Sequence, residues 1–253
     1  MKDLKGKVVL VTGGSTGIGA AAARAFAGQG ARTMVHYNAS KDAAAELVAD
    51  IGRLGGEARM IGGDVTNLDN VSRIVQETVQ EMGRLDVLVN NVGSLVKRTP
   101  VTDYSIELLD DVLNINVRQL VWFVREAAVV MRRQGGGNII NTTSIAARNG
   151  GGPGSVLYAA AKGFVSTATR GWARELAADK IRVNAVSPGV ILTPFHERFT
   201  TAAQLSAMQA TVPMQRLGEP EECAGTFLYL ASDQLSGYVT GQTVEVNGGQ
   251  WMA

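Results

Sequence analysis

Short apolar runs rich in Val and Ile alternate along the chain with longer stretches that have the spacing of amphipathic or alanine-rich helices. Glycine, asparagine or proline bounds most of the runs, which is typical of buried strands in a parallel sheet. The pattern predicts seven strands, at residues 7–12, 31–37, 57–61, 85–90, 136–143, 181–187 and 243–246.

The stretches between these runs predict helices at residues 20–27, 41–54, 67–82, 155–179 and 220–231, and a mostly helical stretch at residues 103–133. Residues 194–211 are polar and mixed, and we interpret them as a short helical lid over a site. Neither a linker nor a break in composition divides the chain. The pattern therefore predicts an α/β fold in one domain over residues 1–253, a doubly wound parallel sheet of about seven strands with helices on both faces.

Composition and charge narrow the classes of function. The 253 residues are 45% hydrophobic and 19% charged, as in ordinary globular proteins, and the net charge of +1 gives no indication of a nucleic acid or an anionic membrane as partner. Cys223 is the one cysteine, so an intramolecular disulfide and a cysteine metal cluster are excluded, and we interpret it as a buried structural thiol. No other cluster of metal ligands is visible, and no metal is expected.

The first residues, Met1 to Lys5, are charged and lack the apolar run of a signal peptide. No apolar stretch reaches the length needed to span a membrane. We therefore expect a cytoplasmic protein.

A glycine-rich turn, Gly13-Gly14-Ser15-Thr16-Gly17-Ile18-Gly19, joins the first predicted strand to the first predicted helix. Such a turn lets the backbone approach a phosphate, while the helix N-terminus directs free N–H groups and positive dipole toward it. The spacing is G-x-x-x-G-x-G, which differs from the commoner G-x-G-x-x-G of dinucleotide-binding proteins. Its place between strand and helix predicts a dinucleotide site in a Rossmann-type domain.

The end of the second strand bears on which dinucleotide is bound. An Asp or Glu there would accept a hydrogen bond from a ribose 2′-OH, but this chain has Tyr37, Asn38, Ala39, Ser40 and Lys41. A missing carboxylate with two donors nearby favours NADP(H), and NAD(H) stays possible. Ser40 has the alternative role of capping the following helix.

Tyr158 and Lys162 are four residues apart in a predicted helix, so their side chains project from one face. A free tyrosine has a pKa of about 10 and a free lysine of about 10.4. An ammonium beside a phenol lowers the pKa of the phenol, so the pair predicts a group that transfers protons near neutral pH. Taken alone, such a pair is more often a solvated helix face.

Other polar residues stand where strands end or inside apolar helices. Asp64 follows the third strand, where it accepts from an adenine amino group or simply shapes the turn, and Asn90 ends the fourth. Ser144 follows the fifth strand. Asn114 and Asn116 interrupt an apolar helix, which predicts a buried polar task for one of them.

Together these stretches resemble the short-chain dehydrogenase/reductases of about 250 residues, over essentially the whole chain. The matching stretches are Thr12 to Gly19, Asp64-Val65, Asn90-Asn91-Val92-Gly93, Asn116, Ser144, Tyr158-Ala159-Ala160-Ala161-Lys162, Pro188-Gly189 and Thr193. Each is degenerate alone, but their order and spacing are specific.

The resemblance implies an NAD(P)-dependent interconversion of a ketone and a secondary alcohol. Tyr158 is then the general acid/base, and Lys162 lowers its pKa and binds the nicotinamide ribose. Ser144 is similar to the residue that polarises the substrate oxygen, and Asn116, favoured over Asn114, to the one that holds a water of a proton relay.

The cofactor contacts are implied in the same way. Thr193 resembles the hydroxyl that contacts the nicotinamide carboxamide, and Asn90 a residue that flanks the adenosine. The full set expected to bind the cofactor is Gly13, Ser15, Thr16, Gly17, Ile18, Gly19, Tyr37, Asn38, Ser40, Asp64, Val65, Asn90, Gly93, Tyr158, Lys162, Pro188, Gly189, Ile191 and Thr193.

Three positions depart from the family pattern. Gly14 stands where Ala is common, and Thr16 where NADP-preferring members often have Arg or Lys, which weakens the case for NADP(H). The interval from Ser144 to Tyr158 is about one residue longer than usual.

The sequence leaves the substrate open. It looks most like the 3-oxoacyl-acyl-carrier-protein reductases, which should present basic residues beside the site for an acidic partner. Arg132 and Arg133 are candidates, although Asp179 falls near where such members tend to carry a base. The alternatives are a small sugar, a cyclic polyol or another secondary alcohol, or a catalytically silent cofactor-binding regulator. The resemblance also implies a homotetramer.

Overall fold

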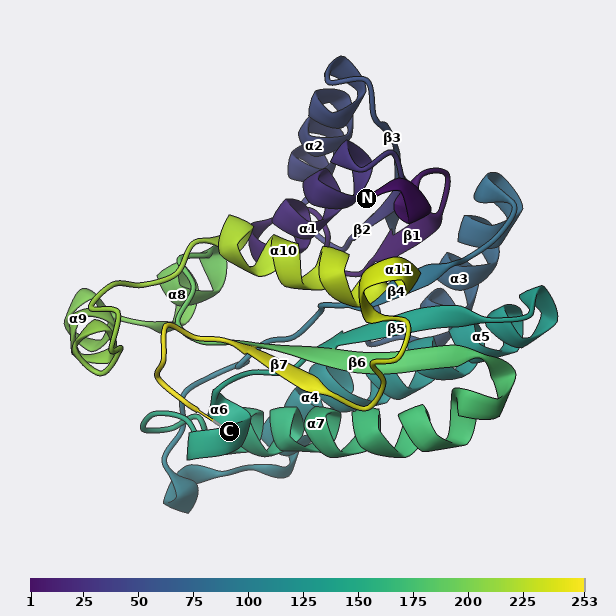
Figure 1. The fold of residues 1–253 in the computed structure, drawn as a ribbon. Coiled ribbons are helices and arrows are strands. Elements are labelled where there is room, and N and C mark those ends of the chain that lie inside the picture. Colours follow the sequence, from purple (N-terminus) through teal and green to yellow (C-terminus); the bar gives the residue numbers. More distant parts are fainter. Residues whose placement is uncertain (253) are drawn as a thin grey trace.

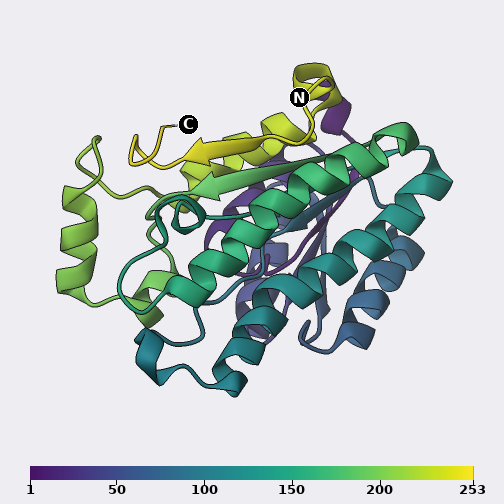
Figure 2. The ribbon, with the colours of Figure 1, turned by 90° about the horizontal axis from the view of Figure 1, so that it is seen from below.

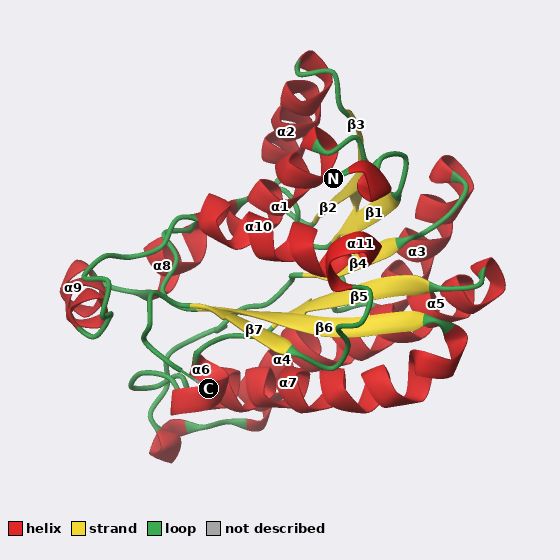
Figure 3. Ribbon diagram, viewed as in Figure 1, coloured by secondary structure: helices red, strands yellow, loops and turns green. Residues whose placement is uncertain are grey.

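A computed structural model describes residues 1–252 of the chain. All seven strands form one parallel sheet in the order β3-β2-β1-β4-β5-β6-β7 (Figures 1 and 3). Their bounds are β1 Val8–Val11, β2 Arg32–Tyr37, β3 Glu57–Gly62, β4 Val87–Asn90, β5 Gly137–Thr142, β6 Ile181–Pro188 and β7 Thr243–Val246. The predicted strands and the predicted fold class are confirmed.

Helices cover both faces of the sheet. One face packs against α1 (Gly17–Gly28), α2 (Lys41–Arg53) and α10 (Pro220–Ala231), and the other against α3 (Leu68–Met82), α5 (Gln119–Gln134) and α7 (Val156–Leu176). Figure 2 shows α3, α5 and α7 side by side on the second face. The remaining helices are α4 (Ile106–Leu113), α6 (Ala146–Asn149), α8 (Pro194–Phe199), α9 (Ala202–Ala210) and α11 (Asp233–Ser236), with short 3₁₀ turns at Lys2–Leu4, Val101–Asp103 and Ala177–Asp179.

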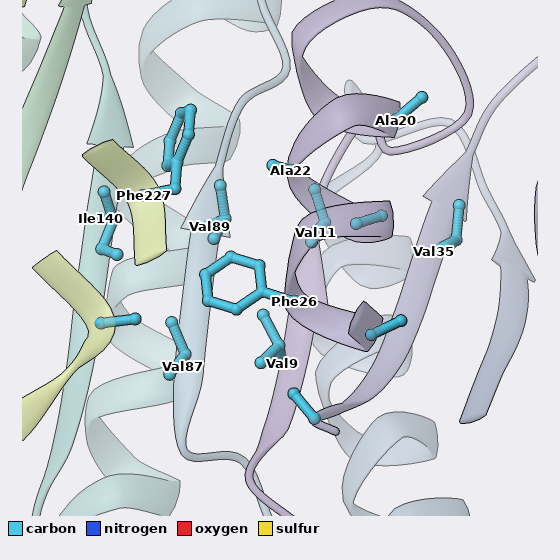
Figure 4. Close-up of a cluster of buried hydrophobic side chains, with 14 of the residues drawn as sticks. Val9, Val11, Ala20, Ala22, Phe26, Val35, Val87, Val89, Ile140 and Phe227 are labelled. Carbon is cyan, nitrogen blue, oxygen red and sulfur yellow. The ribbon is translucent and has the colours of Figure 1, made fainter. Parts of the chain in front are cut away.

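Buried aliphatic side chains hold the layers together. Phe26 of α1 and Phe227 of α10 are fully buried and pack onto Val9, Val87 and Val89 of the central strands (Figure 4). A strand buried on both faces exposes no side chain to water, which explains why the central strands appear in the sequence as continuous apolar runs. Cys223 belongs to this core and is fully buried, as expected.

The stretch 103–133, predicted to be mostly helical, is confirmed. After a 3₁₀ turn at Val101–Asp103, the chain is helical without a gap through α4, a π-helical turn at Asn114–Arg118 and α5. In the π turn the amide of Asn116 donates to Val112 O at 2.9 Å and to Ser94 O at 2.8 Å. A side chain that donates to a backbone carbonyl of its own helix can disturb the regular i→i−4 hydrogen bonds, and one turn then contains an extra residue. Such π turns are frequent at functional sites.

The chain order of the strands reverses between β1 and β4, whose carboxyl ends lie beside each other in the sheet. In an open parallel sheet a ligand crevice forms outside the carboxyl ends at this point. Residues 194–211 form α8 and α9, which project beyond the carboxyl ends of the strands (Figures 1 and 2).

Candidate active site

A cavity of about 840 Å³ opens at the carboxyl edge of the sheet. The glycine-rich turn after β1 forms one side, the ends of β4, β5 and β6 form the floor, and α8 and α9 form the other side. The predicted residues that line it are Gly13, Thr16, Gly17, Ile18, Asn38, Val65, Gly93, Ser144, Tyr158, Lys162, Pro188, Gly189, Ile191 and Thr193.

The glycine-rich turn is placed to cradle a phosphate. Thr16 is the N-cap of α1, and Gly17 opens the helix at a φ of +54°, a conformation that other residues rarely adopt. The free N–H groups of the first turn of α1 therefore face the cavity, as an anionic diphosphate requires. Thr193 lies directly opposite, since a Cβ on Gly17 would be 3.1 Å from Thr193 Cγ2. Ser15 and Gly19 are absent from the cavity lining, and Gly19 instead packs against Gly13 O.

At the end of β2, Asn38 reaches the cavity but its predicted neighbours do not. The ring of Tyr37 packs on Gly62. Ser40 is the N-cap residue of α2, but its hydroxyl makes no capping hydrogen bond, so the alternative role proposed for it is wrong. Asp64 accepts from Thr66 N at 2.9 Å and so shapes the turn after β3.

Two asparagines support the site from behind its surface. Asn90 is buried, and its amide donates to Asn141 Oδ1 at 2.9 Å, so its side chain braces the strand ends and does not line the cavity. Asn116 is buried too, whereas Asn114 binds the exposed Arg118. A Cβ on Gly93 would be 3.0 Å from Asn116 Oδ1 and 2.8 Å from Lys162 Nζ, so Gly93 allows these two groups to approach each other.

Tyr158 and Lys162 point from α7 to the ends of β4 and β5. Lys162 is 3% exposed, and its ammonium donates to Thr142 O at 2.8 Å. The ammonium nitrogen lies 5.7 Å from the centroid of the Tyr158 ring. The Ser144 hydroxyl lies close enough to the hydroxyl of Tyr158 to affect its pKa, and it accepts from Ala146 N at 3.1 Å. Three of the four predicted catalytic groups thus meet in one wall of the cavity, with Asn116 behind Gly93.

The acid–base properties of this pair differ from the prediction. Burial raises the pKa of Tyr158 to about 12, and the neighbouring hydroxyl of Ser144 lowers it less than burial raises it. Burial also lowers the pKa of Lys162 to about 8. The expectation that Lys162 lowers the pKa of Tyr158 is wrong, because burial raises that pKa and the Lys162 ammonium donates to Thr142 O.

The lowered pKa of Lys162 makes stability depend on pH. Between the pKa of about 8 in the folded protein and the usual 10.5, the unfolded chain binds a proton that the folded protein has lost. The free energy of unfolding therefore rises with pH, by about 2 kcal/mol from pH 7 to pH 9.5. Urea unfolding of the natural protein and of Lys162→Met at both pH values measures this gain, which the variant should lack. An equal pH dependence in the two proteins would show that Lys162 titrates normally.

Several cavity residues were missed by sequence reasoning. Asn91, in the strand-end motif but not among the predicted contacts, donates to Thr12 O at 3.2 Å and Gly13 O at 3.1 Å. His36 of β2 accepts from Gly13 N at 3.1 Å and also lines the cavity. Phe195 of α8 faces Tyr158 with 5.6 Å between ring centroids. Whether these side chains face the cavity depends on how the strands end and on packing between distant segments. No short stretch of sequence shows either.

The basic residues proposed to receive an acidic partner lie elsewhere. Arg132 and Arg133 end α5, next to the amino end of β5, at the edge of the sheet opposite the cavity. Arg132 pairs there with Asp179 at 2.7 Å. The expectation that they flank the site is therefore wrong.

Two kinds of feature are absent from residues 1–252. No group of three His, Cys, Asp or Glu side chains is arranged there to bind a metal ion. Within the same residues, no helix combines the length and apolar character needed to cross a bilayer.

A protein-family model described as "Enoyl-(Acyl carrier protein) reductase" matches residues 13–250. The chain belongs to the short-chain dehydrogenase/reductase family. It is 39% identical over 250 residues to a 3-oxoacyl-[acyl-carrier-protein] reductase of Thermotoga maritima, which covers 97% of this chain and 98% of that protein. It is 37% identical to 3beta-hydroxysteroid dehydrogenase 1 of Eggerthella lenta, over 98% of this chain and 94% of that one.

Among solved structures, the NADH-dependent reductase A1-R′ of alginate metabolism superposes with a TM-score of 0.92 at 32% identity over the full length of both chains. The fold, the family and these relatives agree on the class of reaction. The protein is an NAD(P)-dependent oxidoreductase that interconverts a ketone and a secondary alcohol.

Proposed function

We propose that this protein reduces the keto group of a 3-oxoacyl thioester, with Tyr158 as proton donor. The observation that carries the proposal is that the hydroxyls of Ser144 and Tyr158 lie next to each other in the wall of a largely apolar cavity, with Lys162 beneath them. The identity to a 3-oxoacyl-[acyl-carrier-protein] reductase supports the substrate class.

The cavity fits a dinucleotide at its other end. The bound nicotinamide supplies or accepts the hydride. The N-terminus of α1 at Gly17 would hold the diphosphate, and Thr193, which faces Gly17 at close range, would hold the carboxamide. Lys162, at the bottom of the cavity, is placed to bind the ribose hydroxyls.

Reduction places negative charge on the carbonyl oxygen, and the hydroxyls of Ser144 and Tyr158 donate to it. Tyr158 then transfers its proton to that oxygen, so C=O becomes CH–OH. Tyr158 is protonated at neutral pH and can therefore give this proton in the reductive direction. Burial, which raises its pKa to about 12, makes it a weaker acid than a free phenol. Asn116, beside Lys162, is placed to hold a water that returns the proton through the lysine.

The test compares kcat/KM for 3-oxobutanoyl-CoA, for a neutral cyclic ketone and for the enoyl thioester 2-butenoyl-CoA. The proposal predicts turnover of the oxoacyl thioester well above the ketone and none of the enoyl thioester. A preference for a sugar or cyclic alcohol would make the protein a small-molecule dehydrogenase. Reduction of 2-butenoyl-CoA alone would contradict carbonyl chemistry.

The cofactor is proposed to be NADP(H). Asn38 is exposed at the end of β2 and lines the cavity, where a carboxylate would repel a 2′-phosphate. Thr16 adds no positive charge, and the similar reductase A1-R′ is NADH-dependent, so NAD(H) is the competing cofactor. The cytoplasmic location and the homotetramer stay predictions.

We expect Asn38→Asp to lower kcat/KM for NADPH about 10- to 100-fold and to leave that for NADH nearly unchanged, because the new carboxylate would face the 2′-phosphate. Steady-state kinetics with both cofactors measures this, and Asn38→Ser is the matched neutral control. Equal losses with both cofactors would show that Asn38 does not face the 2′ position.

A further inference from the structure

The charged side chains that line the cavity are all basic. They are Arg98, Lys162 and Arg198, and among the described residues that line the cavity none is Asp or Glu. Lys162 belongs to the catalytic wall and Arg198 is exposed. Arg98, on the loop after β4, is half-buried, so its guanidinium is the charge whose presence in the cavity needs an explanation.

Arg98 differs from the other half-buried arginines of residues 1–252. Arg32, Arg73, Arg148 and Arg182 each pair with a carboxylate within 4 Å. Arg98 has no such partner and donates only to backbone carbonyls, from Nε to Phe199 O at 2.8 Å and from Nη1 to Pro153 O at 3.0 Å. Its Nη2 group is left without a protein acceptor. A partly desolvated cation without a counter-ion is costly unless a ligand supplies the negative charge.

The surroundings of Arg98 place it at the substrate end of the cavity. Its guanidinium lies beside Gly152 and Met208, where a Cβ on Gly152 would be 3.7 Å from Nη1 and 3.9 Å from Met208 Cε. Asn38 and the N-terminus of α1, which serve the cofactor phosphates, belong to the β1–β2 side of the sheet. The cofactor phosphates thus have a separate site, and Arg98 is available to the substrate.

Aromatic contacts join Arg98 to the reacting position. Phe199, whose carbonyl Arg98 binds, stacks its ring edge-on against Phe195 at 5.1 Å between centroids. Phe195 in turn faces Tyr158 at 5.6 Å. A molecule whose carbonyl meets Tyr158 would run along these two rings and reach the guanidinium with its far end.

We propose that Arg98 binds an oxyanion carried by the substrate, a carboxylate or a phosphate separated from the keto group by an apolar spacer. This proposal rests on the carbonyl reduction proposed above and specifies which carbonyl compounds are preferred. Arginine suits the role because its planar fork binds both oxygens of a carboxylate or phosphate. His196 lies near enough to be influenced by this charge, because burial first and the guanidinium of Arg98 second lower the pKa of its imidazole.

Two matched pairs of substrates test the proposal on the natural protein and distinguish the two sources of the anion. One pair is 5-oxohexanoate and its methyl ester, and the other is 3-oxobutanoyl-4′-phosphopantetheine and 3-oxobutanoyl-pantetheine. We expect kcat/KM to favour the charged member of at least one pair about 10- to 100-fold. Preference in the first pair identifies a keto acid, and preference in the second identifies a phosphate. If the neutral member of each pair is turned over as well as its charged counterpart, or better, the proposal is overturned.

Arg98→Gln should remove this preference by lowering kcat/KM for the charged member and leaving that for the neutral member nearly unchanged. Equal losses on both members would show that Arg98 only fastens α8 to the loop at Pro153, and would also overturn the proposal. Lys97→Gln is the matched control, because Lys97 is the exposed neighbour and does not line the cavity. It should leave the preference intact.

Calorimetric binding separates this inference from the proposed function. If no member is turned over with NADPH or NADH, carbonyl reduction fails, but tighter binding of 5-oxohexanoate than of its methyl ester would still support the anion site. Equal binding of acid and ester, together with equal binding of the two pantetheine compounds, would overturn it. The same measurement needs no variant and so does not depend on how Arg98→Gln folds.

Discussion

Tyr158→Phe is expected to lower kcat about a thousand-fold or more and to leave the dissociation constant for the cofactor within about twofold. The change removes one hydroxyl, and with it both the proton given to the carbonyl oxygen and one of the two donors to the developing charge. The ring keeps its contact with Phe195 at 5.6 Å, so the cavity should keep its shape. Stopped-flow or steady-state kinetics, with cofactor binding followed by fluorescence, measures both quantities.

Tyr238→Phe is the control for this substitution, because Tyr238 is fully exposed and lies outside the cavity. It should leave kcat unchanged. Turnover of Tyr158→Phe within about tenfold of the natural protein would mean that water or another side chain supplies the proton.

Lys162→Met is expected to lower kcat at least a hundred-fold and to weaken cofactor binding about tenfold, because one ammonium serves both tasks. Without cofactor at pH 7, the free energy of unfolding of the variant should nevertheless equal or exceed that of the natural protein. Burial lowers the pKa of Lys162 to about 8, and a charge kept in a desolvated site costs about 1–3 kcal/mol there. Methionine has a similar length and no charge, so it removes this cost.

Kinetics, cofactor titration and urea unfolding of the same preparation give the three values. Lys2→Met, at an exposed lysine near the N-terminus, controls for the loss of a charge. A lower rate with unchanged cofactor affinity would remove the ribose role of Lys162. A large loss of stability would show that its bond to Thr142 O outweighs the cost of burial.

The sequence predicted the sheet well because its physical signal is local. A strand buried on both faces needs consecutive apolar residues, and parallel strands joined by helices need turn residues at both ends. The glycine-rich turn and the pair Tyr158 and Lys162 are local in the same sense, since a tight turn and a helical spacing of four fix their geometry.

What the sequence could not predict depends on contacts between distant segments. Within the π turn at Asn114–Arg118, the amide of Asn116 donates to Ser94 O in a loop that is distant in sequence. Burial reverses the expected pKa shift of Tyr158 because neighbours from β5 and α8 exclude water from it. Arg98 stands in no motif, and only the fold brings it beside Phe199.

Arg132 and Arg133 illustrate an error that general rules could have avoided. A helix between two parallel strands runs antiparallel to them, so its C-terminus lies at the amino edge of the sheet, away from the ligand crevice. Basic residues at the end of α5 were therefore never candidates for a partner that docks at the cavity.

The most direct test of the account follows hydride into the product. The protein is supplied with NADPH deuterated at the transferred position of the nicotinamide and with 3-oxobutanoyl-CoA, and the product is analysed by NMR. The account predicts a 3-hydroxyacyl thioester with deuterium on the carbinol carbon, formed by the natural protein and not by Tyr158→Phe. Deuterium on a carbon next to the carbonyl, an unchanged keto group, or equal labelling by the variant would contradict it.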